Sequence, residues 1–103
     1  MATEKVKVPI NGNEAERNGW LENISQYLSA GKDVEFVDRE TGVDINISRI
    51  IINGAGNVTI WEKGCIKADG QSIALTAGEV HNIGGIHGIN ISDTSATGIH
   101  VKI

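Results

Sequence analysis

Hydrophobic and polar residues alternate with a period of two along most of this chain, and the main exception lies near the N-terminus. The stretch from Lys5 to Val8 alternates charged and apolar residues, which predicts a first strand, and Pro9 places that strand at an edge or marks its end. From residue 33 onward, short alternating runs recur between turns rich in glycine. These runs predict strands at 33–37, 43–47, 49–53, 57–61, 65–68, 72–75, 80–83, 86–91 and 99–103.

One short helix is predicted at about residues 19–29, where the period changes to that of a helix. Asn18 is a suitable N-cap and Gly31 a suitable C-terminal stop. The apolar positions that fall on one face of this helix are Trp20, Leu21, Ile24, Tyr27 and Leu28. No other segment has this spacing.

The composition agrees with many short strands joined by tight turns. Hydrophobic residues make up 40% of the 103 residues and aromatic residues only 4%, so the core has to be built from Ile, Val and Leu. Thirteen glycines against one proline supply the turns. The sequence therefore predicts one domain over residues 1–103, mainly β, an antiparallel β-sandwich or jelly-roll-like fold with one short N-terminal helix.

The charge balance and the single cysteine restrict the partners and the compartment. Nine basic against thirteen acidic residues give a net charge of -4, which disfavours binding to nucleic-acid backbones. No run approaches the ~20 apolar residues that cross a bilayer, and the N-terminus lacks the apolar stretch of a secretion signal. Cys65 has no second cysteine to pair with, which fits synthesis in the cytoplasm. We expect no nucleic-acid partner and no membrane association.

The histidines are the first candidates for a metal site. Gly84 and Gly85 predict a two-residue hairpin turn, and strand alternation then points His81 and His87 to opposite faces. His100 alternates with apolar residues in the last strand and is expected to face solvent. A zinc site needs its ligands to converge at about 2 Å from one ion, and the His-X-His signature of cupins is absent. We expect no metal and no cofactor, and a cupin-like metal-dependent enzyme is the least favoured function.

Other catalytic patterns are missing too. Cys65, between a glycine and an isoleucine, is typical of a small buried hydrophobe rather than an activated thiol. No Gly-X-Ser-X-Gly motif or phosphate-binding glycine loop is present. Asp38 and Glu40 belong to a predicted loop and are interpreted as solvated charges. We expect no catalytic residues and a protein that is not an enzyme.

Trp61 is the strongest candidate for a binding residue. Alternation in its strand places Asn57, Thr59 and Trp61 on one face, with Val58 and Ile60 on the core side. A tryptophan exposed at a strand end serves as an interface or as a platform for sugar stacking. Alternatively, it covers the end of the core. A carbohydrate or small-ligand binding module is the alternative function that follows from this face.

The C-terminal third carries a resemblance to a known class of proteins. The stretch "DGQSIALTAGEVHNIGGIHGINISDTSATGIHVKI", residues 69–103, resembles the β-sandwich of small virion structural proteins of tailed bacteriophages. In those proteins a short strand, an "AGE"-like turn, another strand and a Gly-Ile segment precede the closing strand. The resemblance implies a structural virion component (head decoration, neck or tail-associated) that forms homo-oligomers and contacts other virion proteins.

Such a protein acts through interfaces, so we ask which residues would form them. The lysines and Pro9 of the first strand discourage pairing with another chain, whereas the last strand, 99–103, is less protected. Pairing there predicts a trimer or a larger ring. Val80, Ile89 and Ile91 are expected in the core. The expected interface residues are Trp61, Ile83, Gly84, Gly85, Ile86, His87 and His100.

Overall fold

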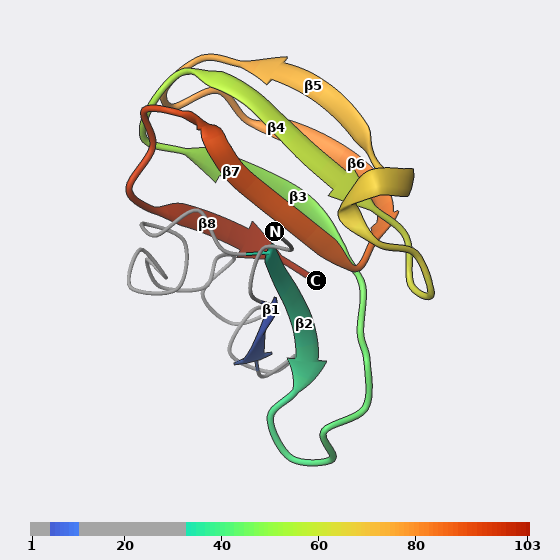
Figure 1. Cartoon of the computed structure of the whole chain (residues 1–103). Coiled ribbons are helices and arrows are strands. Elements are labelled where there is room, and N and C mark those ends of the chain that lie inside the picture. The colour runs from blue at the N-terminus through green and yellow to red at the C-terminus, as the bar shows by residue number, and fades with distance from the viewer. Residues whose placement is uncertain (1–4, 11–32) are drawn as a thin grey trace.

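A computed structural model describes residues 5–10 and 33–103, which form eight strands in two sheets (Figure 1). The helix predicted at 19–29 lies outside the described residues. The elements are β1 (Lys5–Ile10), β2 (Asp33–Asp38), β3 (Ile47–Ile52), β4 (Gly56–Trp61), the 3₁₀ turn η1 (Lys67–Asp69), β5 (Gln71–Leu75), β6 (His81–Ile86), β7 (Gly88–Thr94) and β8 (Ile99–Lys102). The larger sheet has the order β1-β2-β7-β4-β5 and the smaller one the order β6-β3-β8. The prediction of a mainly β, sandwich-like protein is therefore confirmed.

One hydrophobic core joins the two sheets, and strand alternation explains which residues enter it. In β2, Val34 and Phe36 are fully buried in the core. The largest contribution comes from isoleucine, whose branched side chains suit a pleated surface. The buried isoleucines are Ile10, Ile47, Ile50, Ile52, Ile60, Ile83, Ile86, Ile89, Ile91 and Ile99.

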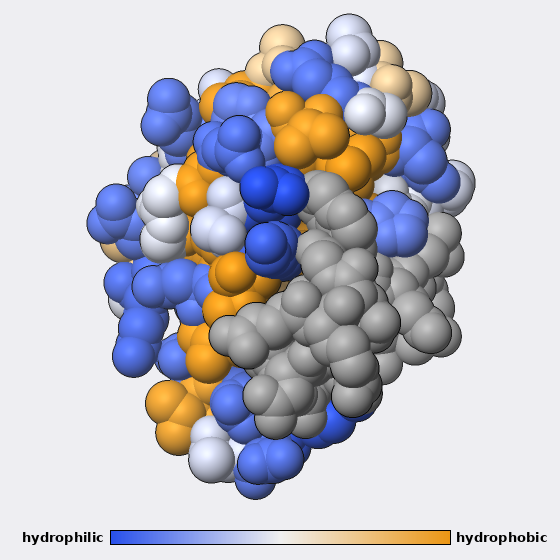
Figure 2. All heavy atoms as spheres, turned by 180° about the vertical axis from the view of Figure 1, so that it is seen from behind, coloured by the Kyte–Doolittle hydropathy of each residue, from blue (hydrophilic) through white to orange (hydrophobic). Residues whose placement is uncertain are grey.

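Two of the three core residues predicted near the C-terminus are confirmed. Ile89 and Ile91 are buried on β7. Val80 is 51% exposed, so its prediction as a core residue is wrong. It lies in the connection that precedes β6 rather than inside a strand. Apolar residues also reach the surface between polar ones elsewhere, as the view from behind shows (Figure 2).

β1 is an edge strand, as Pro9 predicted, but its pairing is parallel. It lies beside β2 with Lys5 opposite Asp33 and Lys7 opposite Glu35. Every other strand pair of the described residues is antiparallel. The parallel register places the two β1 lysines next to the two β2 carboxylates.

The predicted hairpin at Gly84 and Gly85 is wrong. Both glycines lie inside β6, which pairs with β3 in the smaller sheet, whereas β7 lies in the larger sheet. The register shifts between the pairs Ile47–Ile86 and Arg49–Asn82. Between these paired positions β6 has three residues and β3 has one. Gly85 has a φ of +64°, a backbone conformation that glycine adopts freely. The glycines therefore form a β-bulge, and the chain crosses between the sheets at residue 87.

Two other predicted strands are replaced by loops. Of residues 43–47, only Ile47 belongs to a strand, and Asp44 forms an isolated bridge with Val37. Residues 65–68 lead into η1, where the Asp69 carboxylate accepts a hydrogen bond from the backbone N–H of Ile66 at 3.3 Å. η1 packs against β4 and β7 (Figure 1). None of the described residues belongs to a helix long and apolar enough to cross a membrane.

Candidate functional site

The outer face of the larger sheet, turned away from the core, carries two rows of polar residues that cross several strands. The first row consists of Lys7, Glu35, Gly88 and Trp61, which are paired in register from β1 to β4. The second row consists of Lys5, Asp33, Asn90, Thr59 and Ser72, and runs from β1 to β5. Both rows arise because alternate residues of a strand share one face.

Glu35 is the centre of the first row. Its side chain is only 7% exposed, yet it has several polar partners. Lys7 donates a hydrogen bond from Nζ to Glu35 Oε1 at 2.7 Å, and Trp61 Nε1 donates one to Oε2 at 3.3 Å. Lys5 Nζ lies 3.7 Å from the same Oε2. A buried carboxylate requires such partners, because an unpaired one is strongly destabilising.

These contacts determine the charge of Glu35. Burial acts to raise its pKa, but the hydrogen bonds from Lys7 and Trp61 and the charges of Lys7 and Lys5 outweigh burial and hold the pKa below its ordinary value. The same hydrogen bond raises the pKa of Lys7, against partial desolvation, and the charges of Glu35 and Asp44 act in the same direction. Glu35 is thus an ionised carboxylate that links β1, β2 and β4, and its geometry is that of a structural clamp rather than a general acid.

His87 lies next to this cluster, close to the carboxylates of Glu35 and Asp44. Its Nδ1 lies 2.9 Å from the carbonyl oxygen of Ile45. Its Nε2 lies 3.6 Å from Asp44 Oδ1 and 4.0 Å from Glu35 Oε1. The side chain is 2% exposed, and the predicted hairpin after which His87 was placed is not formed. It holds the loop before β3 against the larger sheet.

Trp61 lies on the predicted face of β4, but the prediction that it is exposed is wrong. The residue is 2% exposed. Its indole packs against Gly88, where a Cβ atom would overlap the ring, and its N–H is bonded to Glu35. The alternative interpretation, in which Trp61 is a covering residue, agrees better with this burial, although it covers the outer face of the sheet. Trp61 therefore offers no open platform for a sugar.

In the second row, a β-bulge holds Asn90 and Asp33 together. Between the pairs Thr59–Asn90 and Asn57–Asp93, β7 has one more residue than β4. The Asn90 side chain accepts hydrogen bonds from the N–H and hydroxyl of Ser92 at 2.8 and 2.6 Å. Its Nδ2 donates to Asp33 Oδ1 at 2.6 Å. Bulges of this kind often fix a side chain at a functional site.

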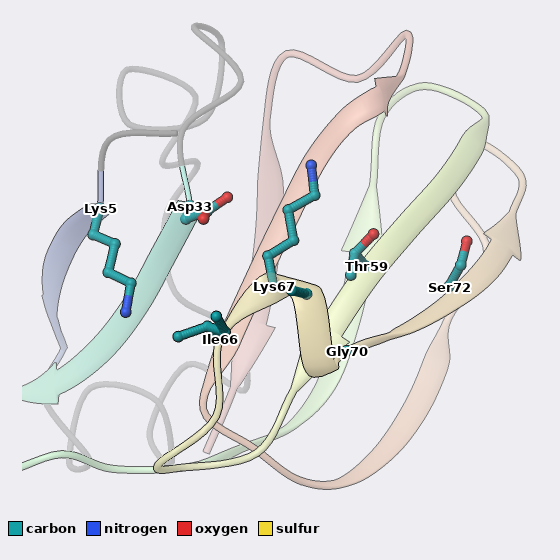
Figure 3. A pocket seen from close by; sticks show the side chains of 8 residues that line it. Lys5, Asp33, Thr59, Ile66, Lys67, Gly70 and Ser72 are labelled. Carbon is teal, nitrogen blue, oxygen red and sulfur yellow. The ribbon is translucent and has the colours of Figure 1, made fainter. Parts of the chain in front are cut away.

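A pocket of about 520 Å³ lies at this second row. Its wall combines the outer face of the sheet with the segment around η1, and Figure 3 shows its side chains coming from β1, β2, β4, β5 and η1. Gly70 has to be glycine for this wall to form, because a Cβ there would come within 2.7 Å of the Ile60 carbonyl oxygen and within 2.8 Å of the Thr59 methyl group. The lining residues are Lys5, Asp33, Thr59, Ile66, Lys67, Ala68, Gly70 and Ser72. This pocket is the candidate binding site.

The predicted interface residues do not form one surface. Ile83 and Ile86, on β6 of the smaller sheet, are buried in the core. Trp61 and His87 are also buried, but in the polar cluster around Glu35 on the larger sheet. Gly84, Gly85 and His100 are exposed, on β6 and β8. The exposure predicted for His100 is confirmed, and its place in an interface stays a prediction together with that of the two glycines.

Sequence reasoning missed most residues of the two rows, although a signal was present. Of the pocket residues it singled out only Thr59, as part of the polar face of β4. Asp33 and Glu35 alternate with the fully buried Val34 and Phe36, and both carboxylates are only 6% exposed. Charged residues at alternate positions of a central strand indicate partners on neighbouring strands. The lysines of β1 are the partners of Glu35, and Asn90 of β7 is the partner of Asp33, but the strand pairing that brings them there is not visible in a local pattern.

The remaining chemical candidates are not brought together. Cys65 is partly exposed, and Asp38 binds the backbone N–H groups of Glu40 and Thr41 at 2.7 and 3.1 Å as a turn residue. Within residues 5–10 and 33–103, no group of three His, Cys, Asp or Glu side chains is placed to hold a metal ion. Comparison of the chain with protein-family models, with curated proteins and with solved structures finds no match.

Proposed function

We propose that this protein is a structural component of a tailed-bacteriophage virion, in a head-decoration, neck or tail-associated position. It works through interfaces with copies of itself and with other virion proteins. The observation that carries the proposal is the character of β5, the outermost strand of the larger sheet. An unprotected edge strand can pair with another subunit in an assembly, whereas a monomer has to protect its edge strands from such pairing.

β5 has none of the features that keep an edge strand from pairing. Its residues, Gln71–Leu75, include no charged residue and no proline, and Ser72 and Ala74 are exposed. Among the described residues, only β4 pairs with it. The opposite edge, β1, carries two lysines and Pro9. A sheet that is protected at one edge and open at the other favours pairing between subunits at the open edge.

The smaller sheet provides a second available edge. β8 pairs with β3 alone among the described strands, and Ile103 just beyond it is 39% exposed. Two different edges allow head-to-tail contacts, which close into a trimer or a larger ring. Eight strands in two sheets also agree with a jelly roll, and we keep that topology as part of the proposal.

Light scattering coupled to size-exclusion chromatography tests the assembly. We expect a mass that is a multiple of the 11.0 kDa chain at high micromolar concentration. Ala74→Lys places a charge on β5 and is expected to shift the protein towards monomer, while Asn57→Lys on the neighbouring strand β4 serves as the matched control. A monomeric wild type argues against the proposal, and an oligomer insensitive to Ala74→Lys removes β5 from the interface. Detection of the chain by mass spectrometry in purified phage particles tests the virion assignment itself.

A second candidate, a carbohydrate or small-ligand binding module, is favoured by the pocket beside Thr59. The polar face that suggested this function is present, but the pocket takes the place of Trp61 as the binding element. The two functions are compatible, because the pocket opens on the outer face of the sheet and not on its edge.

A further inference from the structure

We propose that the pocket between η1 and the outer face of the larger sheet binds an acidic sugar, such as a uronic or sialic acid unit. The hydroxyl groups of the sugar bind to Asp33, Thr59 and Ser72, and its carboxylate lies against Lys67, while Lys5 adds positive charge at the side of the pocket formed by β1. This inference gives the second candidate function its ligand class and rests on that candidate. The site takes only the side chain of Ser72 from β5, whereas assembly would use the backbone edge of that strand, so the two proposals are tested separately.

Asp33 supplies an acceptor that is already fixed in place. It is 6% exposed, and its Oδ1 accepts the hydrogen bond from Asn90. The structure gives its second oxygen no hydrogen bond from any described residue, and no described side-chain oxygen or nitrogen is both fully buried and unpaired. That oxygen therefore faces the pocket that Asp33 lines. A carboxylate oxygen held in this way is a strong acceptor for the hydroxyl group of a sugar.

Thr59 and Ser72 complete the polar floor. They are paired across β4 and β5, so that their hydroxyl groups lie side by side on the face of the sheet. Figure 3 shows both residues on neighbouring strands, to one side of η1. A hydroxyl group both donates and accepts, which matches a ligand whose own groups do the same.

The two lysines make the pocket suited to an anion. Lys67 is partly buried and forms no ion pair with any described residue. Its side chain rises from η1 in front of the sheet, on the side where Asp33 and Thr59 lie (Figure 3). Among the described residues, the ion-pair contact of Lys5 is the 3.7 Å one with Glu35, whose hydrogen bonds are made by Lys7 and Trp61. Two ammonium groups against one carboxylate give the pocket lining a positive charge, although the chain as a whole carries a net charge of -4.

The pocket lining contains one carboxylate, Asp33, and two ammonium groups, those of Lys5 and Lys67, and this combination limits the class of ligand that can bind. A phosphate dianion would place two negative charges near Asp33 and would present at most one hydroxyl group as a donor to this carboxylate. A neutral sugar would leave the ammonium groups unused. A ligand with one negative charge and several hydroxyl groups can pair with an ammonium group and also donate hydrogen bonds to Asp33. Ile66 and Ala68 provide an apolar wall, with Ile66 47% exposed, against which the C–H face of a sugar ring packs.

Isothermal titration calorimetry tests the ligand class. The probes are glucuronic, galacturonic and N-acetylneuraminic acids, with glucose, galactose, glycine and inorganic phosphate for comparison. We expect binding of at least one acidic sugar that weakens with added salt, and no binding of the other four. Equal binding of the neutral sugars, or binding of phosphate or glycine alone, would overturn the acidic-sugar class. Binding of neutral sugars would still support the second candidate function, a carbohydrate or small-ligand binding module.

Three variants locate the binding. Lys67→Gln is expected to weaken binding of the acidic sugar by about ten-fold or more, the usual effect of losing a hydrogen bond to a charged group, and Thr59→Val by about three- to ten-fold, the effect of losing one to a neutral hydroxyl group. Lys102→Gln, on the other sheet, removes the same charge and is expected to change nothing. Unchanged affinity in Lys67→Gln and Thr59→Val, with circular dichroism showing that both are folded, overturns the site. Absence of any sugar binding at millimolar concentration overturns the second function as well, while light scattering on the same samples tests the assembly separately.

Discussion

Trp61 and Gly88 face each other across β4 and β7, and the indole of Trp61 occupies the space that a side chain at position 88 would fill. The pair covers the buried carboxylate of Glu35, which binds the indole N–H. The absence of a side chain on β7 therefore makes room for the largest side chain on the outer face of the sheet. A tryptophan that pattern analysis assigns to solvent is buried because its cross-strand partner is glycine.

This contact predicts a large effect for Gly88→Ala. The added methyl group overlaps the indole, so the ring has to move and its hydrogen bond to Glu35 is strained or lost. We expect a loss of about 2–4 kcal/mol in the free energy of unfolding, measured by urea denaturation. Gly84→Ala is the control, because nothing lies within 4 Å of a Cβ at that position, and it is expected to change stability by about 0.5 kcal/mol or less. If Trp61 is the cause, Gly88→Ala costs far less in a Trp61→Ala background.

Glu35 makes the stability of the fold depend on acid pH. Its pKa in the folded protein lies below the ordinary value of 4.5, so the folded state binds protons less readily than the unfolded state. The stabilisation is fully present above the unfolded pKa and is lost as the pH falls through the folded pKa. Glu35→Gln is expected to cost about 1–2 kcal/mol at neutral pH and to flatten the decline in stability between about pH 5 and pH 3.

Urea unfolding at a series of pH values measures this effect. Glu40→Gln, in the exposed loop after β2, removes the same charge and is expected to keep the acid dependence of the wild type. A Glu35→Gln curve parallel to the wild-type curve over the acid range would contradict the role assigned to the carboxylate.

We predict that hydrogen bonds to the side chain of Asn53 are the main interactions that hold the loop between β7 and β8. Its Oδ1 accepts the backbone N–H groups of Thr97 and Gly98 at 2.8 and 3.1 Å, and its Nδ2 donates to the Thr97 hydroxyl at 3.2 Å. Asn53→Ala leaves two backbone donors without their acceptor and is expected to cost about 1–2 kcal/mol by thermal or urea unfolding. Asn57→Ala serves as the control, because the Asn57 side chain has no hydrogen bond to any residue in the described part of the chain. Equal stability of the two variants would show that the loop has other support.

The correction at Val80 leads to a paired test of the core. Ile89 is fully buried between the sheets, so Ile89→Ala is expected to cost about 3 kcal/mol or more. Val80→Ala removes a side chain that is 51% exposed and is expected to cost no more than about 0.5 kcal/mol. Chemical denaturation measures the free energy of unfolding of both variants. A large loss of stability in Val80→Ala would show that Val80 belongs to the core.

The fold class was predictable because alternation and glycine content are local properties. β2, β4, β5 and β8 lie close to their predicted ranges. The Gly84–Gly85 pair was predicted to be a hairpin turn, which is wrong, because a bulge and a hairpin turn have the same local signal. Only the partner distinguishes them. β6 pairs with β3, more than thirty residues earlier in the chain.

The candidate site was much less predictable. Thr59 was singled out as part of a polar face, whereas Asp33, Lys5 and Lys67 were not. These three residues belong to β2, β1 and η1, and the pocket forms only when the sheet order brings those elements together. Burial of Trp61 could not be foreseen either, since it depends on a glycine that faces it from β7.

The position of β7 in the larger sheet has a consequence for how the chain folds. β7 lies between β2 and β4, so the sheet remains in two separate parts until residues 88–94 have been synthesised. The smaller sheet likewise takes up its last strand, β8, after almost the entire chain has been made. Folding during translation is therefore limited to local pairs such as β4 with β5, and the cooperative step waits for the C-terminal third. Ribosome-bound chains that end before residue 88 should remain sensitive to proteases, and protection should appear in one step once β7 and β8 have left the exit tunnel.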